Sequence, residues 1–149
     1  MELDVAVLLD GYEGGVGRTF PIPWGRRLND GERAAGRRWS EAWRAVTAQC
    51  RPGRTGADLR RACTSAGASP QGDSWLVSVG IGVEGPFGEK ERLAEGMVLS
   101  VGLSVVEGDL RLYARETVLV TPTGADPLCR AAGGPLVTPV AARPHVGLS

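Results

Sequence analysis

Two long β-prone runs with three residues between them constrain the fold more than any other feature of this sequence. Residues 97–106 and 110–120 are rich in valine and leucine and are long enough for strands. Glu107-Gly108-Asp109 connects them, and so short a connection with a central glycine indicates a hairpin. The chain is therefore expected to contain an antiparallel sheet in which these two strands are neighbours.

Two helices are expected earlier in the chain. Asn29 or Asp30 can cap a helix over about residues 31–49, in which apolar side chains recur near helical spacing. A capping box that begins at Thr55 opens a shorter helix, over about residues 55–66. Both helices precede the hairpin, so they can pack together on the sheet that it belongs to.

The first part of the chain and the segment after the helices complete the pattern. Val5–Leu9 is a continuous apolar run closed by Asp10-Gly11, which predicts a buried strand that ends in a turn. Gly14–Gly17 predicts a flexible segment, and residues 18–23 resume an extended path outside any central ladder position because of their prolines. Residues 75–83 predict a further strand.

The order of these elements predicts the fold class. A strand, two helices and then three strands are typical of an α+β unit, with a mainly antiparallel sheet and both helices on one face. The chain has 149 residues, enough for one domain with a core of ordinary size. We assign residues 1–128 to this domain. Glycine, proline and small residues dominate residues 129–149, which predicts a flexible C-terminal tail.

Charge and composition argue against several classes of function. The 17 basic and 17 acidic side chains cancel, so no nucleic-acid partner is expected. The N-terminus has no basic region and no long apolar run, so we expect no signal peptide or membrane span and a cytoplasmic protein. Arginine greatly outnumbers the single lysine, which is typical of a GC-rich bacterial genome.

The cysteines and the histidine narrow the chemistry further. The three cysteines are widely spaced and form no Cys-x-x-Cys pair, so we expect idle thiols and neither zinc ligands nor disulfides. His145 is the only histidine and lies in the tail, which excludes a histidine-based catalytic centre in the body of the domain. The four tryptophans are expected in the core or at an interface.

Five short segments, in one order along the chain, resemble the motifs of a known family. The first is Leu8-Leu9-Asp10-Gly11 with Gly14–Phe20, similar to the family's Asp-x-Gly and its Thr-Arg-Thr-Phe ending. The others are Arg51–Leu59 (Arg-Pro-Gly-x-Thr-x-x-Asp-Leu), Ser78–Gly82 (Gly-His-Gly-Ile-Gly), Leu93–Val101 (Leu-x-x-Gly-Met-Val) and Glu116–Gly124 (Thr-Val-Leu-Val-Thr-x-x-Gly). Over about residues 4–128 the chain thus resembles the pita-bread metallopeptidases of family M24, which include methionine aminopeptidases, Xaa-Pro aminopeptidases and creatinase-like proteins.

The resemblance implies the second half of a pita-bread domain, whose two halves share one curved sheet about a pseudo-twofold. It also implies a metal site, because the family holds two divalent metals through two Asp, one His and two Glu, and the metals activate a water. These positions fall here at Asp10, Gly15, Val79, Gly102 and Arg115. Only Asp10 keeps a ligand, so we expect no metal, no other cofactor and no working peptidase.

Three charged residues beside this pocket leave alternatives open. Arg115 is expected to form an ion pair with Asp10 that replaces the metal charge, although an Asp before Gly is also a common turn residue. A bulge that moved Glu116 into the last ligand position would leave two carboxylates, which suits at most a weakly held Mg²⁺ or Ca²⁺. Arg18 is expected either to hold a substrate carboxylate or to form an ordinary salt bridge.

The combined expectation is a catalytically inactive, pseudo-aminopeptidase domain that binds a partner protein or peptide through the old cleft. A lone half-domain exposes strand edges and an apolar face, so we also expect a homodimer or a second chain to complete the sheet. Two alternatives stay open. The chain could be an enzyme of a biosynthetic pathway that reuses the metal-free pocket for a small molecule, or a truncated remnant of an aminopeptidase.

Overall fold

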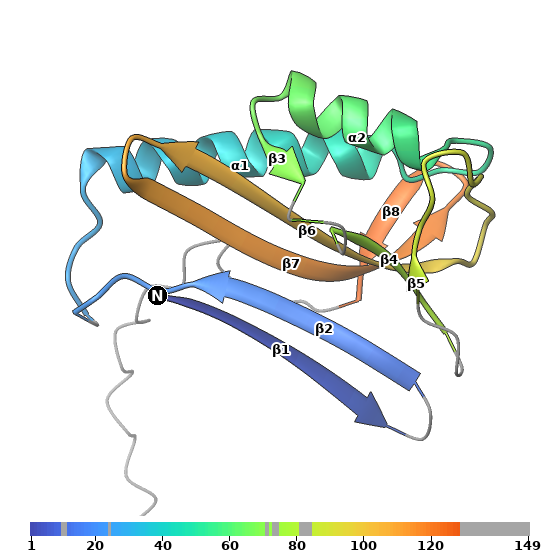
Figure 1. Ribbon diagram of the computed structural model, residues 1–149, viewed down its shortest axis with the longest axis horizontal. Helices are drawn as coiled ribbons and strands as arrows, with labels where there is room; N and C mark the ends of the chain where they lie inside the picture. Colours follow the sequence, from blue (N-terminus) through green and yellow to red (C-terminus); the bar gives the residue numbers. More distant parts are fainter. Residues whose placement is uncertain (10–11, 24, 71, 73–74, 81–84, 129–149) are drawn as a thin grey trace, which may run out of the picture.

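One curved sheet and two helices make up the part of the chain that the computed structural model describes, which is residues 1–128 without 10–11, 24, 71, 73–74 and 81–84 (Figure 1). The sheet runs in the order β1-β2-β7-β6-β4-β5, while β3 pairs with β6 and β8 pairs with β7. The elements are β1 (Glu2–Leu9), β2 (Tyr12–Thr19), α1 (Asp30–Gln49), α2 (Gly56–Ser65), β3 (Ser69–Pro70), β4 (Leu76–Val79), β5 (Gly85–Pro86), β6 (Val98–Glu107), β7 (Leu110–Thr121) and β8 (Gly124–Pro127).

The predicted hairpin is the centre of this sheet. β6 and β7 pair in an unbroken antiparallel register from Val98↔Leu119 to Glu107↔Leu110. Gly108 turns the chain between them with a φ of 57°, a left-handed conformation that costs glycine little. The α+β class and the antiparallel sheet with two helices on one face are confirmed.

Both predicted helices are present, each with the capping box that its sequence suggested. The side chain of Asn29 accepts a hydrogen bond from the amide of Glu32, whose carboxylate accepts one from the amide of Asn29. Thr55 and Asp58 do the same at the start of α2. Such reciprocal bonds satisfy amides that a helix leaves without an internal partner, and so they fix where each helix begins.

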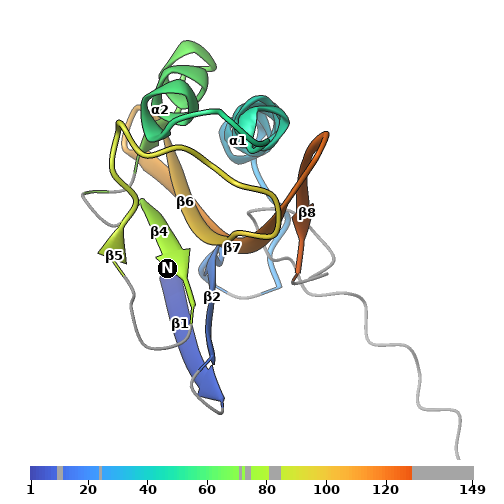
Figure 2. The same ribbon diagram turned by 90° about the vertical axis from the view of Figure 1, so that its right-hand side faces the viewer.

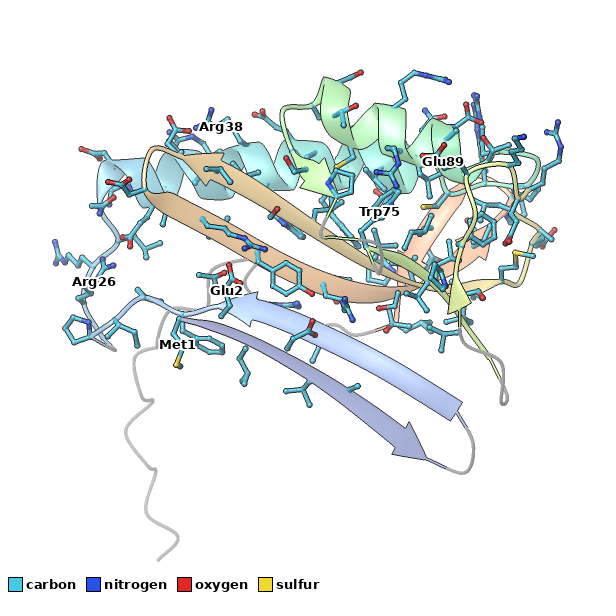
Figure 3. All side chains as sticks on the ribbon, in the orientation of Figure 1. Met1, Glu2, Arg26, Arg38, Trp75 and Glu89 are labelled. Carbon is cyan, nitrogen blue, oxygen red and sulfur yellow. The ribbon has the colours of Figure 1, made fainter. Side chains whose placement is uncertain are left out.

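The core lies between the helices and one face of β6 and β7 (Figure 2). α1 presents Trp39, whose indole N–H donates to the Leu103 carbonyl oxygen at 3.0 Å. Trp75 is also buried and lies beneath α2 (Figure 3). The Arg60 guanidinium lies over its ring, 5.4 Å from the ring centroid. Trp43 stacks on Trp39 and is half-buried, so these three tryptophans belong to the core and its border. Trp24 lies outside the described residues.

The N-terminal predictions need two corrections. The glycine-rich segment is not a flexible loop: β2 pairs with β1 over eight residues, and its glycines allow close approach to bulky side chains of β7. β1 is not buried either, because it forms an edge of the sheet and no described helix packs on its outer face. Leu3 is 50% exposed and Val5 39%. A run of apolar residues indicated a strand but could not show how many of its faces are covered.

Smaller expectations have mixed outcomes. Cys50 and Cys63 are buried free thiols, and burial raises their pKa to about 12 and about 11, so both stay protonated and unreactive.

β8 was not anticipated, because Thr121 was expected to end the last strand and the chain instead turns back there along β7. In the part of the chain described, no helix is long and apolar enough to cross a membrane. The predicted tail, residues 129–149, lies outside the described residues.

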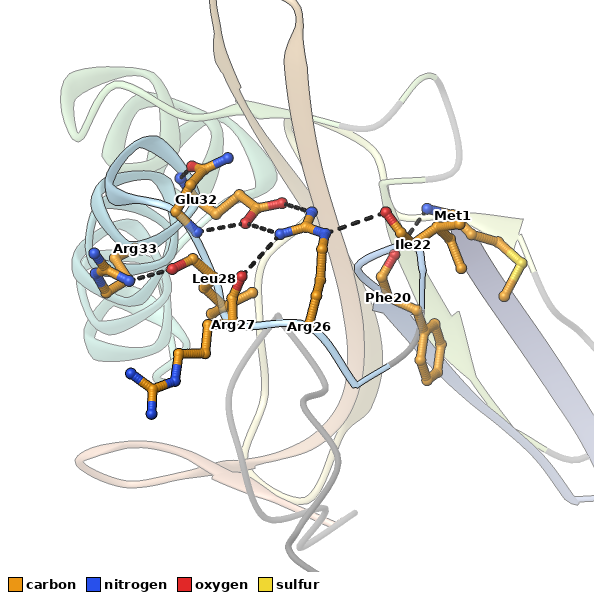
Figure 4. A network of polar contacts seen from close by, with 9 residues as sticks. Met1, Phe20, Ile22, Arg26, Arg27, Leu28, Glu32 and Arg33 are labelled. Carbon is orange, nitrogen blue, oxygen red and sulfur yellow. Dashed lines mark hydrogen bonds and ion pairs between the residues drawn. The ribbon is translucent and has the colours of Figure 1, made fainter.

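A polar network fixes the path from β2 to α1 (Figure 4). Arg26 forms a two-pronged ion pair with Glu32 and donates from Nε to the Ile22 carbonyl oxygen at 3.1 Å. At the other end, the Met1 amino group donates to the Phe20 carbonyl oxygen at 2.9 Å. The hydrogen bond from Arg26 lowers the pKa of Glu32 below its usual range despite its burial. The network therefore ties the start of α1 to the end of the β1–β2 hairpin.

This pair makes a pH-dependent contribution to stability. A carboxyl whose pKa is lower in the folded state stabilises the fold above its unfolded pKa, near 4.5 here, and loses that effect as the pH falls through the folded value. Glu32→Gln should therefore lower the free energy of unfolding by about 1 kcal/mol at pH 7, a figure kept small because Arg26 is partly exposed. Urea unfolding across pH 2–8 measures the difference from wild type. It should shrink below pH 4.5, and an unchanged difference there would contradict the assignment.

Candidate functional site

The open face of the sheet, on the side away from the helices, gathers the positions that the resemblance singled out. Directly paired residues in antiparallel strands project from the same face. Asp4 pairs with Gly17, Gly17 with Arg115, and Arg115 with Gly102, which makes one row across β1, β2, β7 and β6. Two of the expected ligand positions, Gly102 and Arg115, are thus direct neighbours.

The next rows carry two more of these positions. The space above Gly15 is bordered by Arg115 and Ser100: a Cβ atom built there would lie 3.5 Å from Arg115 Cδ and 3.6 Å from Ser100 Oγ. Val79 pairs with Val98, four residues along β6 from Gly102 on the same face. Gly15, Val79, Gly102 and Arg115 therefore share one face, whereas Asp10 lies outside the described residues.

β2 is held on β7 by two threonine hydroxyls, one on each side of the Gly17–Arg115 pair. Thr19 Oγ1 donates to the Tyr113 carbonyl oxygen at 2.8 Å and accepts from the Tyr113 amide at 2.9 Å. Thr117 Oγ1 does the same for Gly15, at 2.9 and 3.1 Å. Each hydroxyl stands in for a pair of ladder hydrogen bonds, so the backbones separate while every polar group keeps a partner.

Asp4, Tyr113 and Arg115 form a polar cluster at the centre of this face. The Tyr113 hydroxyl donates to Asp4 Oδ2 at 2.7 Å, and Arg115 Nε lies 3.5 Å from the same oxygen. Burial and the hydrogen bond to Asp4 raise the pKa of the Tyr113 phenol well above its usual range, while Arg115 acts in the opposite direction. The expected ion pair of Arg115 with Asp10 is untested, and among described residues Asp4 takes that role.

Two glycines make room for this cluster. A Cβ at Gly17 would lie 2.7 Å from Tyr113 Cε1 and 3.0 Å from Arg115 Cβ, so any side chain there would collide with β7. A Cβ at Gly102 would lie 3.3 Å from the Tyr113 ring and 3.5 Å from Arg115 Nε. A glutamate at position 102 would need the space that Tyr113 and Arg115 occupy. The residue at position 102 therefore limits which side chains fit at positions 113 and 115.

Arg18 and Glu116 lie on the opposite face of the sheet and pair with each other. Arg18 is buried, contacts Glu116 through Nη2, and donates from Nη1 to the Arg115 carbonyl oxygen at 2.9 Å. Burial raises the pKa of Glu116, and the Arg18 guanidinium opposes that shift. The ladder of β6 and β7 has no bulge at this point, so Glu116 does not reach the face of Gly102. For Arg18 the geometry is that of a salt bridge.

The described residues at the expected ligand positions do not fit a pair of divalent metals. Gly15, Val79 and Gly102 offer no side-chain donor atom, and the Arg115 guanidinium carries a permanent positive charge at the position where the resemblance implies a carboxylate. Within the described ranges, no three His, Cys, Asp or Glu side chains are grouped so that they could hold a metal ion. No chemical step through a metal follows from this arrangement.

Sequence reasoning missed Asp4 and Tyr113. Asp4 lies before the apolar run that predicted the first strand, and the strand begins earlier, at Glu2. The alternation Glu2-Leu3-Asp4-Val5 is the signal that would have placed both acidic side chains on one face and both apolar ones on the other. Tyr113 stands two residues before Arg115 in β7, so it shares that face with Arg115.

Several solved structures are similar to the fold of this chain. The chain is similar in structure to an X-Pro aminopeptidase from Thermotoga maritima (TM-score 0.73, 20% identity, 91% of this chain and 40% of that one) and to a prolidase from Pyrococcus furiosus (0.65, 22%, 85% and 40%). It is also similar to a methionine aminopeptidase from Rickettsia prowazekii (0.60, 18%, 85% and 62%). No curated protein matches its sequence significantly.

The fold is thus a partial pita-bread fold, and the chain spans only about two-fifths of the length of the prolidase and the X-Pro aminopeptidase. The model of metallopeptidase family M24 matches residues 1–122. The chain belongs to metallopeptidase family M24. The resemblance and the fold class inferred from the five motifs are confirmed, whereas the roles of the individual site residues stay predictions.

The docking of β2 on β7 can be tested with two glycines of the same strand. Gly17→Ala should lower the free energy of unfolding by about 1–3 kcal/mol, because its Cβ would overlap Tyr113. Gly14→Ala is the matched control and should be nearly neutral, since nothing lies within 4 Å of a Cβ there. Chemical denaturation measures both. Equal effects of the two substitutions would contradict the described packing.

The hydrogen bond between Asp4 and Tyr113 can be measured by a double-mutant cycle. Asp4→Asn and Tyr113→Phe should show a coupling energy of about 0.5–1.5 kcal/mol in unfolding experiments, because Asp4→Asn replaces the charged acceptor of the bond with a weaker neutral one and Tyr113→Phe removes its donor. Glu2→Gln is the control: Glu2 projects from the same face of β1 but lies near Arg111, at 3.6 Å. Its effect should add to that of Tyr113→Phe without coupling.

Proposed function

We propose that this chain is a catalytically inactive domain of family M24 that binds a partner protein or peptide and completes its sheet with a second chain. The observation that carries the first part is the place of Arg115. Its side chain borders the space above Gly15 and lies beside Gly102, so a guanidinium stands among three positions where family members hold metal. A cation there repels divalent metals and pairs with Asp4 instead.

The intact core and helix caps favour a protein kept folded by selection over the truncated remnant of an aminopeptidase. The core between helices and sheet is continuous, and both helices keep complete capping boxes. The changes on the open face also fit one another, since Gly17 and Gly102 leave room for Tyr113 and Arg115. Independent decay would leave clashes and unmatched charges at a site built for metals.

The need for a partner follows from what the chain leaves uncovered. β1 is an edge strand of the described sheet, and Leu3 and Val5 project from its outer face. Edge strands with apolar faces are surfaces on which other strands add. A protein or peptide that adds beside β1 would satisfy its free backbone groups and cover these side chains.

A small molecule is a second candidate occupant of the open face, and Ser100 favours it. Ser100 is 6% exposed, and within the described residues its hydroxyl has no hydrogen-bonding partner. The hydroxyl borders the same space above Gly15 as Arg115 does. A metabolite held there would raise the melting temperature of the isolated chain, whereas a partner-binding domain would be stabilised only by its protein partner.

Metal binding and hydrolysis test the proposal directly. Purified protein is incubated with Mn²⁺, Co²⁺ or Zn²⁺, separated from free metal, and analysed for bound metal and for cleavage of Xaa-Pro dipeptides and of peptides with N-terminal methionine. We expect much less than one metal per chain and no cleavage above buffer, because the donor set at the former site is missing. An active member of the family, treated identically, is the positive control. Stoichiometric metal with hydrolysis would overturn the proposal.

A further inference from the structure

Among the described residues no strand pairs with the outer edge of β1, and the directions of the backbone groups along that edge can be assigned. Met1 and Phe20 exchange both hydrogen bonds across the hairpin, at 2.7 and 2.9 Å. Hydrogen-bonded pairs of this kind alternate along an antiparallel ladder, so the backbone N–H and C=O groups of Leu3 and Val5 also point toward β2. The backbone N–H and C=O groups of Glu2, Asp4 and Ala6 point away from β2. The edge therefore presents a regular set of donors and acceptors.

Several of the usual protections of an edge strand are missing from β1. Its eight residues contain no proline and no lysine, and they pair with β2 without a bulge. The two charges that β1 carries, Glu2 and Asp4, turn toward the sheet and lie 3.6 and 3.5 Å from Arg111 and Arg115. Because each lies near an arginine of the same chain, it repels another strand less than an unpaired carboxylate would.

The outer face of the same strand is apolar. Leu3 and Val5 are 50% and 39% exposed. Figures 1 and 2 show both helices over β6 and β7, with the β1–β2 hairpin below and away from them. A second strand beside β1 with the same alternation would extend this apolar strip, and each copy would bury part of the other's.

We propose that the occupant of this edge is a second copy of the chain, paired antiparallel through β1 about a twofold axis at Val5. This inference rests on the proposed function, because it names the partner that completes the sheet. A twofold axis at Asp4 would set Asp4 against itself, and one at Leu3 would set Asp4 against Glu2, so both bring like charges together. An axis at Val5 sets Asp4 opposite Ala6 and pairs residues 2–8 of each copy.

This register also matches the free backbone groups. With the axis at Val5, Asp4 and Ala6 of opposite copies form a hydrogen-bonded pair, because both direct their amide groups to the outer edge. The two Val5 residues then form a non-hydrogen-bonded pair, whose Cα atoms lie about 4.5 Å apart in antiparallel sheets. Self-complementarity in charge, face and hydrogen bonding identifies a copy of this chain as the partner.

Cross-linking tests this register at one position. Val5→Cys is made in a Cys129→Ser background, since Cys50 and Cys63 are buried. Mild oxidation should link the two copies, because facing Cα atoms about 4.5 Å apart suit a disulfide. Leu3→Cys is the matched control: it is on the same strand and face and is at least as exposed. Its two copies would lie about 13 Å apart along the strands, so it should not cross-link.

Light scattering on the purified chain supplies the second measurement. Wild type should have twice the chain mass of 15.6 kDa. Ala6→Pro should shift it to the monomer with an unchanged circular dichroism spectrum, because the lost amide points to the outer edge. A wild-type monomer at high concentration, or a dimer that links through Leu3→Cys and not through Val5→Cys, would overturn the inference.

These outcomes separate this inference from the proposed function. A monomer that binds a different protein or peptide at β1 overturns the second copy and leaves a non-hydrolytic binding domain standing. A dimer that cross-links through Val5→Cys but carries stoichiometric metal and cleaves peptides supports the interface and overturns the proposed function. A dimer that is insensitive to Ala6→Pro uses another surface and overturns the inference.

Discussion

The attachment of the β1–β2 hairpin to β7 is the interaction on which the open face depends. Only Gly17↔Arg115 pairs directly there, and Thr19 and Thr117 bridge the backbones on either side. This attachment brings Asp4 over Tyr113 and Arg115, because Asp4 pairs with Gly17. A side chain at position 17 would push the hairpin away and separate the charges. The chemistry of the face is thus set by a close backbone approach that only glycine permits.

Arg115 balances the charge of Asp4 on the open face. In the family, several carboxylates tolerate one another because divalent cations lie between them. Without the cations, such a cluster would repel itself or raise its pKa values until protons bound. Among the described residues of this chain, the Arg115 guanidinium lies beside the carboxylate of Asp4, and the phenol of Tyr113 donates to the same oxygen. These three side chains together carry one positive and one negative charge.

The sequence alone predicted those features of the fold that short-range sequence patterns determine. Capping residues at Asn29 and Thr55 marked both helix starts, and the short link at Gly108 marked the central hairpin. The motifs gave the family and singled out Gly15, Gly102 and Arg115, which the register sets on one face of the sheet. The second strand was missed because its glycines have no strand preference of their own; they are there because β7 needs the space. That requirement lies about a hundred residues away in sequence, where periodicity cannot show it.

Asp4 links the polar cluster of the open face to the edge of the described sheet. Its carboxylate contacts Tyr113 and Arg115, while its backbone N–H and C=O groups point outward, away from β2. Arg115 therefore reduces the negative charge that would otherwise guard this edge. If Arg115 were the glutamate of a metal-binding relative, Asp4 would face a like charge in a metal-free chain, and the edge would stay negative. Arg115 thus acts both on the polar cluster of the open face and, through Asp4, on the charge along the edge of β1.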